Sequence, residues 1–434
     1  MKLIRRFNLV AALSIALWCG CDPAPKPASP PAPAAPAAAS QATNPPPAAK
    51  AADGHAHAHG ESPKKSGKGK RDVVRVGVES LDVAVDGNTV HLLLGDYLAE
   101  TKLPALQHLR STDGGATWSQ PVRVDVGATA PHIPHRGMDA QLAAIGPKLV
   151  AIWNTPGTGF MGRGPMATAI STDGGATWQP GPNPADDASS GDHSFVDCAA
   201  DASGTFHLVW LDSRGPGKGL RYANSRDGGR TWSKNTTLKP ETCECCWNTL
   251  AVGADGSVHA LFRDKNPRDM AVISSADNGA HWSDLAKVGR FNWDFQGCPH
   301  VGGGLIVRGS TLHALVWTGA ADHSGAYHLF SSDRGRSWSA PQRLGDSDAR
   351  RGDLATTGSQ SLAAVWDRVG DGESAVFAAL STDGGKTWSE AKQLSSKGIN
   401  AAYPRVIAVS GGYRVFWTEA ATGKPSVWKM SSLP

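Results

Sequence analysis

One eight-residue pattern, Ser-x-Asp-x-Gly-x-x-Trp, occurs six times in this chain of 434 residues. At intervals of 60, 54, 50, 56 and 50 residues, the copies begin at Ser111, Ser171, Ser225, Ser275, Ser331 and Ser381. Intervals of this length are typical of four-stranded sheets arranged around an axis. Because one such unit cannot bury its apolar face alone, neighbouring units must pack against each other. The repeat therefore predicts an all-β fold, a β-propeller of four-stranded blades.

The chemistry of the repeated pattern is that of a tight turn. Each copy lies between two short stretches of alternating apolar and polar residues, which places it on a hairpin. The Ser hydroxyl and the Asp carboxylate can cap backbone N–H groups of the turn, and we expect the Trp to cover the hairpin as an apolar lid. Asn278 and Arg334 replace the first Gly in two copies, whereas the second Gly is always present. Only the second position is therefore expected to require glycine.

These six copies resemble Asp boxes, and over residues 72–434 the chain resembles the sialidase-like (BNR/Asp-box repeat) β-propellers. The resemblance implies that the boxes lie on the outer rim, far from the axis where ligands bind. The boxes therefore predict the fold and say little about activity.

Seven pairs of strands precede or follow the boxes. They begin near Leu81, Met138, Ser194, Trp247, Pro299, Gly352 and Tyr403. The seventh pair is followed by one more strand, and we expect residues 72–80 to supply its missing outer strand and to close the ring. Seven blades are favoured. The alternative is six blades, which is the number that a resemblance to catalytic sialidases implies.

The N-terminus is typical of an exported protein. A basic "MKLIRR" precedes an apolar "LVAALSIALW", and Gly20-Cys21 resembles a bacterial lipoprotein cleavage site. The resemblance implies that residues 1–21 are a signal peptide and that Cys21 is lipidated, which anchors the protein in the cell envelope; ordinary secretion is the alternative. Residues 22–71 are rich in Pro and Ala and predict a disordered tether, whose His55, His57 and His59 could hold Zn²⁺ or Cu²⁺ loosely.

The charge balance argues against one class of partner. Lys and Arg exceed Asp and Glu by 43 to 39, and part of this excess lies in the signal and tether. The propeller is therefore close to neutral, which gives no electrostatic support for nucleic-acid binding. We expect a monomer that binds a small molecule, a glycan or a metal at the propeller axis.

Five cysteines concentrate in the loops that precede the innermost strands, called leading loops below. In the third, fourth and fifth blades these are Cys198, Cys243, Cys245, Cys246 and Cys298. With His193 and His300 they could form a soft-metal site for Zn²⁺ or Cu⁺. The alternative is two disulfides and one leftover thiol, as expected in an oxidising compartment.

The enzymatic alternative is a glycoside hydrolase. By resemblance, a sialidase needs three arginines that clamp a substrate carboxylate, a Tyr nucleophile activated by Glu, and an Asp acid. The candidates are Tyr403, Arg405, Arg368, Arg263 and Asp139. However, the Tyr/Phe-Arg-Ile-Pro motif of that family is missing, and "YPRV" at residues 403–406 is only a weak echo of it. A protein-docking platform is the third possibility.

Overall fold

The computed structural model describes residues 77–132, 139–159, 162–189, 191–370 and 373–434. All of them lie in one compact unit, Ala58–Pro434. Strands are the only long regular elements in these ranges, where no helix could cross a membrane. The predicted signal peptide, Cys21 and the His tract of the tether lie outside the described residues.

The strands form seven antiparallel sheets, six with four strands and the last with three. The first strands are β1 (Gly77–Asp86), β5 (Gln141–Ile145), β9 (Ser194–Ala200), β13 (Thr249–Val252), β17 (Gly304–Arg308), β21 (Ala349–Thr356) and β25 (Asn400–Val409). The second strands are β2 (Thr89–Tyr97), β6 (Lys148–Pro156), β10 (Phe206–Asp212), β14 (Val258–Arg263), β18 (Thr311–Thr318), β22 (Leu362–Gly370) and β26 (Gly412–Ala420).

The fourth strands, which six of the seven sheets have, are the shortest, with two to four residues. The third strands are β3 (Pro104–Ser111), β7 (Arg163–Ser171), β11 (Gly219–Ser225), β15 (Met270–Ser275), β19 (Gly325–Ser331), β23 (Glu373–Ser381) and β27 (Val427–Leu433). The fourth strands are β4 (Val122–Arg123), β8 (Gln179–Gly181), β12 (Thr236–Lys239), β16 (Ala286–Lys287), β20 (Gln342–Gly345) and β24 (Lys392–Gln393).

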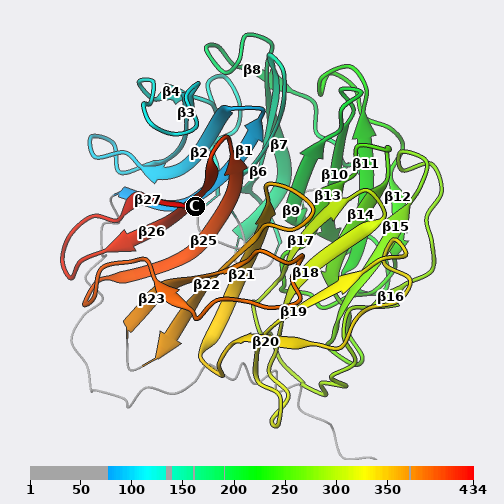
Figure 1. The fold of residues 1–434 in the computed structure, drawn as a ribbon. Coiled ribbons are helices and arrows are strands. Elements are labelled where there is room, and N and C mark those ends of the chain that lie inside the picture. The colour runs from blue at the N-terminus through cyan, green and yellow to red at the C-terminus, as the bar shows by residue number, and fades with distance from the viewer. Residues whose placement is uncertain (1–76, 133–138, 160–161, 190, 371–372) are drawn as a thin grey trace, which may run out of the picture. The chain divides into compact units, whose positions relative to one another are not determined.

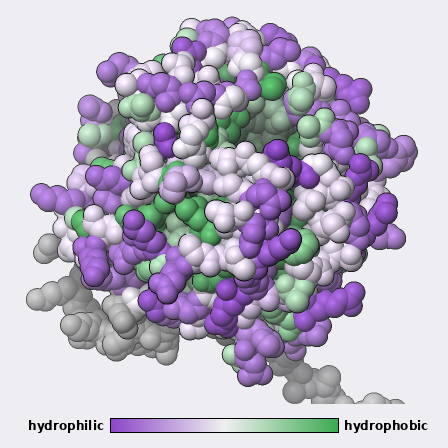
Figure 2. Space-filling model, in the orientation of Figure 1, coloured by the Kyte–Doolittle hydropathy of each residue, from purple (hydrophilic) through white to green (hydrophobic). Residues whose placement is uncertain are grey.

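The first strands of successive sheets contact one another around a complete ring, in the order β1, β5, β9, β13, β17, β21, β25 and back to β1. Figure 1 shows the sheets as blades around this ring, with the red β25–β27 beside the blue β1 and β2. The prediction of a seven-bladed β-propeller is confirmed, and the six-bladed alternative is wrong. Seen from the same side, the surface is mostly hydrophilic, and hydrophobic residues show mainly in its recesses (Figure 2).

The expected closure of the ring by residues 72–80 can be compared with the structure only for residues 77–80. Residues 77–80 begin the innermost strand β1, so the first pair starts at Gly77 and not near Leu81. Gly77 also forms a parallel bridge with Ser426 of the last blade, and the Val78 N–H donates to the Ser426 carbonyl oxygen at 2.9 Å. Residues 72–76 lie outside the described residues, and closure through them stays a prediction.

Hydrophobic contacts between neighbouring blades form the core. The second strands are the most buried: every residue of β10 and of β14 is buried. One cluster joins Val209 and Tyr222 of blade three to Val258 and Phe262 of blade four. Because such clusters lie between blades, each blade depends on its neighbours for burial of its apolar faces.

All six boxes occupy the turn between the third and fourth strands and share one hydrogen-bond pattern. The Ser hydroxyl donates to the Asp carboxylate at 2.7 to 2.9 Å and accepts from the N–H of the second Gly at 2.8 to 2.9 Å. The Asp carboxylate also accepts the N–H four residues after it at 2.8 to 2.9 Å. The predicted capping role of Ser and Asp is thus present in each copy.

The box also contacts the preceding blade, which the sequence did not indicate. A Cβ on Gly279 would overlap the hydroxyl of Tyr222 in blade three, and one on Gly175 would overlap His108 in blade one. The box tryptophans point the same way: Trp282 packs edge-on against Tyr222 at 4.8 Å between ring centroids. The tryptophan therefore packs against the neighbouring blade in addition to its own hairpin.

Candidate metal centre

Three thiols lie in the loop between β12 and β13, which leads into the innermost strand of blade four. They belong to Cys243, Cys245 and Cys246. The Thr242 N–H donates to the Lys218 carbonyl oxygen at 2.8 Å, and the Cys243 N–H donates to the Arg263 carbonyl oxygen at 3.0 Å. Lys218 comes directly before β11 of blade three, and Arg263 ends β14 of blade four. These backbone bonds therefore hold the loop to two blades and fix where its thiols lie.

The separations among these thiols suit a shared metal ion. The Cys243 Sγ lies 3.7 Å from the Cys245 Sγ and 3.6 Å from the Cys246 Sγ. A disulfide would require about 2.05 Å. Two sulfurs at these separations that each lie about 2.3 Å from one metal would subtend about 105° at it, close to a tetrahedral angle. The three thiols are almost completely buried.

A second group of donors extends this site toward solvent. The ligand atoms of Cys245, Cys298 and His300 all lie within 4.8 Å of one another. Cys298 and His300 come from the leading loop of blade five and are exposed. His300 has a backbone φ of 51°, which is a costly conformation for a residue other than glycine. The two loops thus bring four thiols and one imidazole together, buried on one side and open on the other.

Cationic side chains flank the thiols. The Arg268 guanidinium donates to the Cys243 Sγ at 2.9 Å. Burial lowers the pKa of Arg163, while the negative charges of Asp192, Cys245 and Cys298 act in the opposite direction. Positive charge next to sulfur favours the thiolate, which is the form that binds metals.

The thiols share their protons unequally. Hydrogen bonds from the Cys245 and Cys246 thiols hold the pKa of Cys243 well below its usual range. The pKa of Cys245 is raised because its proton is held by hydrogen bonds to its neighbours, and burial raises that of Cys246 to about 12. A hydrogen bond from Cys245 lowers the pKa of Cys298 to about 7. The lowered pKa values of Cys243 and Cys298 favour their thiolate forms, which are the forms that bind metals.

The two other predicted ligands lie elsewhere and belong to neither donor group. Cys198 is in the innermost strand β9, packed in the core between blades two and three, and burial raises its pKa well above the usual value. The His193 Nε2 lies 3.0 Å from an oxygen of Asp187. The metal set that the structure brings together is therefore five of the seven predicted residues.

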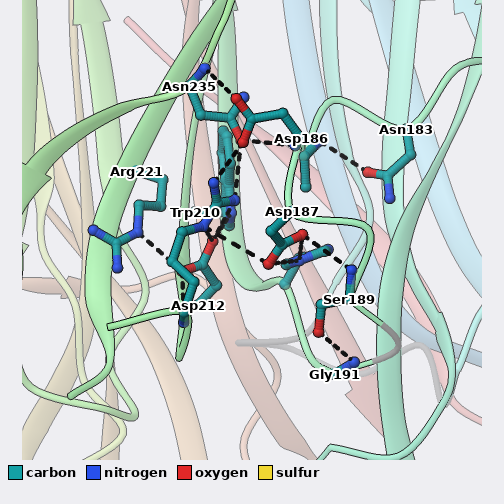
Figure 3. A network of polar contacts seen from close by, with 12 residues as sticks. Asn183, Asp186, Asp187, Ser189, Gly191, Trp210, Asp212, Arg221 and Asn235 are labelled. Atoms are coloured by element: carbon teal, nitrogen blue, oxygen red, sulfur yellow. Dashed lines mark hydrogen bonds and ion pairs between the residues drawn. The ribbon is translucent and has the colours of Figure 1, made fainter. Parts of the chain in front are cut away.

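Asp187 and Asp212, whose carboxylates lie close to His193, belong to the network of hydrogen bonds and ion pairs in Figure 3. Asp187, His193 and Asp212 have donor atoms within 4.8 Å of one another. However, the Asp212 carboxylate accepts hydrogen bonds from Trp210, Arg214 and Arg221, each at 2.9 Å. Because Asp212 is already neutralised by two guanidinium groups, this network has the character of a structural ion-pair cluster.

Two of the candidate sialidase arginines lie apart from the axis. Arg263 is buried, donates to three backbone carbonyl oxygens at 2.7 to 3.1 Å and stacks on Trp293 at 5.3 Å. Arg368 is exposed and pairs with Asp346 and Asp348 at 2.9 and 3.3 Å. Each is engaged by its own neighbours, so the two do not form a clamp around one carboxylate.

The other three candidates are closer together. Arg405 lies in an axial cavity of about 160 Å³, pairs with Asp82 at 3.2 Å and interacts electrostatically with Asp139. Tyr403 lies two residues away on β25, has a φ of 59°, and stacks beneath the Arg351 guanidinium at 4.0 Å. The axis thus holds one arginine surrounded by carboxylates.

Sequence reasoning missed Arg268, which contacts the Cys243 thiol, and also Arg163 and Lys218, which pair with Asp192. Arg163, Lys218 and Arg268 lie at the start of, or just before, the third strands of blades two, three and four. These are equivalent positions in successive blades. Aligning the blade sequences by their boxes could have revealed that these three blades carry a basic residue at the same position.

Comparisons with known proteins agree with the fold. A profile of the BNR/Asp-box repeat matches residues 169–180 and 379–390. A PL25 ulvan lyase bound to -[GlcA(1-4)Rha3S]- is 12% identical, with a TM-score of 0.57, over 83% of this chain and 94% of the lyase. The Hadza microbial sialidase Hz136 is 17% identical, with a TM-score of 0.45, over 76% of this chain and 74% of its own. No curated protein sequence matches significantly. The chain is therefore a seven-bladed β-propeller that carries Asp-box (BNR) repeats.

Proposed function

We propose that this propeller is a metal-binding protein of the cell envelope that holds a soft ion, Cu⁺ or Zn²⁺, at its thiol cluster. The observation that carries the proposal is the convergence of Cys243, Cys245, Cys246 and Cys298, from two leading loops, with His300 at their edge. Thiolate and imidazole are the donors that these ions prefer. The Arg268 guanidinium, within hydrogen-bond distance of the Cys243 sulfur, offsets part of the charge that such a site accumulates.

The disulfide alternative accounts for fewer of these features. Two disulfides would remove the thiolate beside the Arg268 guanidinium, whereas Arg163 would keep its ion pair with Asp192 at 3.5 Å. Arg268 is half-buried and would keep its hydrogen bond to the Phe295 carbonyl oxygen but lose its charged neighbour. The contact between the Arg268 guanidinium and the Cys243 sulfur therefore favours a site that keeps its thiolates.

The metal proposal is tested by metal analysis with thiol counting. Protein purified under reducing conditions should bind Cu⁺ or Zn²⁺ and should shield four thiols from an alkylating reagent. Cys243→Ser should lose most of the binding, whereas Cys198→Ser, which removes a buried thiol outside the cluster, should bind as the wild type does. If the purified protein has four oxidised cysteines and takes up no metal after reduction, the proposal is wrong.

A sialidase or other glycosidase function has weaker support. The candidate arginines Arg263, Arg368 and Arg405 lie in three separate environments, and Tyr403 stacks on a guanidinium without a glutamate in the described contacts. The ulvan lyase with the same fold is bound to a saccharide, which keeps a glycan at the axial face worth testing. We expect no turnover of a fluorogenic sialoside. Turnover that Arg405→Ala abolishes would favour the glycosidase.

The envelope location rests on the N-terminal sequence alone. We propose that Cys21 carries a lipid and that the tether places the propeller away from the membrane surface. Labelled palmitate should be incorporated into the wild type and not into Cys21→Ala. Label in both proteins, or in neither, would contradict this part of the proposal.

A further inference from the structure

The thiol cluster contains two groups of donors, and Cys245 belongs to both. One group is Cys243, Cys245 and Cys246, and the other is Cys245, Cys298 and His300; within each group all donor atoms lie within 4.8 Å of one another. Among the described residues, no four of these donors form such a group. A tetrahedral ion with bonds of about 2.3 Å needs four donors within about 3.8 Å of one another. One ion therefore cannot take four of these donors without rearrangement of the loops.

We propose that the cluster binds two Cu⁺ ions, one in each group, with the Cys245 thiolate as a bridge between them. This inference rests on the proposed metal-binding function. A thiolate sulfur has several lone pairs and can bind two soft cations at once. Three-donor groups suit Cu⁺, which accepts three ligands, better than Zn²⁺, which takes four in structural sites.

The charge of the site favours a second monovalent ion. One Cu⁺ with four thiolates leaves three negative charges in a largely buried cluster, and a second Cu⁺ leaves two. Arg268 contacts Cys243 in the inner group, and Arg163 interacts with Cys245 and Cys298 in the outer group. The inner ion thus has a guanidinium in contact with one of its donors, and the outer donors are attracted by the charge of Arg163, which itself pairs with Asp192 at 3.5 Å.

The two groups differ in access to solvent. The sulfurs of the inner group belong to residues that are at most 5% exposed. In the outer group, Cys298 and His300 are exposed and only Cys245 is buried. The outer ion should therefore exchange with a competing chelator, and the inner ion should remain bound longer. Such an arrangement suits a protein that accepts copper at one position and retains it at the other.

The bridging thiolate limits the distance between the ions. With two bonds of about 2.3 Å to the same sulfur, the ions lie at most about 4.6 Å apart. X-ray absorption spectroscopy at the copper edge detects a neighbouring copper at the shorter end of this range. This measurement on the wild-type protein does not depend on whether any variant folds.

The experiment is an anaerobic titration of the reduced full chain with Cu⁺ against a coloured Cu⁺ chelator, followed by metal analysis. The wild type should bind two Cu⁺ per chain and show a copper neighbour in the absorption spectrum. His300→Ala and Cys298→Ser change only exposed residues and should each bind one Cu⁺ and lose the copper neighbour. Cys246→Ser should also bind one, which then exchanges freely. Cys198→Ser should bind two.

The outcomes separate the two proposals. One Cu⁺ per wild-type chain without a copper neighbour would overturn the two-ion inference and leave the metal-binding function in place. Two ions that persist in His300→Ala and Cys298→Ser would overturn the assignment of the outer group. Failure to bind any Cu⁺ or Zn²⁺ would overturn both proposals.

Discussion

The Asp197 carboxyl in the axial cavity should make the stability of the propeller fall as pH rises. Burial raises the pKa of Asp197 to about 7 from an ordinary value of 3.8, against the opposing effect of the Arg405 guanidinium. The folded state therefore binds a proton that the unfolded state has released between about pH 4 and pH 7. A difference of about 3 pKa units corresponds to about 4 kcal/mol. This stabilisation is complete below the unfolded pKa and is lost as pH rises through the folded pKa.

The substitution Asp197→Asn isolates this effect. The Leu250 N–H donates to the Asp197 carboxylate at 2.6 Å, and an Asn oxygen can accept the same hydrogen bond. Relative to the wild type, the variant should gain about 4 kcal/mol of unfolding free energy between about pH 4 and about pH 8. Carboxylates that do not interact with Asp197 titrate equally in both proteins, so their contributions cancel in the difference.

The assay is urea denaturation of both proteins at the two pH values, with the reduced protein throughout. Asp322→Asn, at an exposed position, is the control and should differ from the wild type by the same amount at both pH values. If the difference between Asp197→Asn and the wild type also stays constant with pH, the axial carboxyl is ionised in the folded protein and the reasoning fails.

Three further predictions concern the boxes, the axis and the metal. In urea denaturation, Gly279→Ala should lower the unfolding free energy by more than about 2 kcal/mol, because the new methyl group overlaps Tyr222. Gly256 also has a positive φ but faces open space, so Gly256→Ala should lower it by only about 1 kcal/mol. Arg405→Met leaves Asp82 and its neighbours without a counter-charge and should lower the unfolding free energy by about 3 to 5 kcal/mol; a smaller loss would show that the carboxylates are neutral. Bound metal at a thousand times its dissociation constant should add about 4 kcal/mol of stability, seen as a rise in Tm that a chelator reverses; a Tm that does not change would contradict tight binding.

The fold could be predicted from the sequence because its strongest signals are local and repeated. The box needs specific residue types within eight positions, and its spacing gives the blade length. The partner of the box tryptophan could not be predicted, since the Trp282 contact with Tyr222 crosses from blade four to blade three. Contacts between blades depend on how the ring closes, which short-range patterns do not encode.

The thiol cluster was partly predictable for a similar reason. Cys243, Cys245 and Cys246 are neighbours in sequence, and Cys298 lies in the next leading loop. Assigning Cys198 to a loop is wrong, because β9 runs from Ser194 to Ala200 and packs Cys198 in the core with Val196. Because side chains alternate between the two faces of a strand, Cys198 lies on the same face of β9 as Val196. The contact between Arg268 and the Cys243 thiol could not be predicted, because it depends on how the two loops are placed in three dimensions.

The contacts of the box glycines give the ring a direction and one seam. Each box presses on the blade before it, and Gly115 of blade one reaches Met430 of blade seven, so six boxes fasten six of the seven junctions. At the remaining junction, between blades six and seven, the Tyr413 hydroxyl instead bonds to Ser361 at 2.7 Å. A buried hydrophobic cluster that includes Val365 of blade six and Val415 of blade seven also joins these two blades, so the last junction of the ring is held by direct packing of strands without a box.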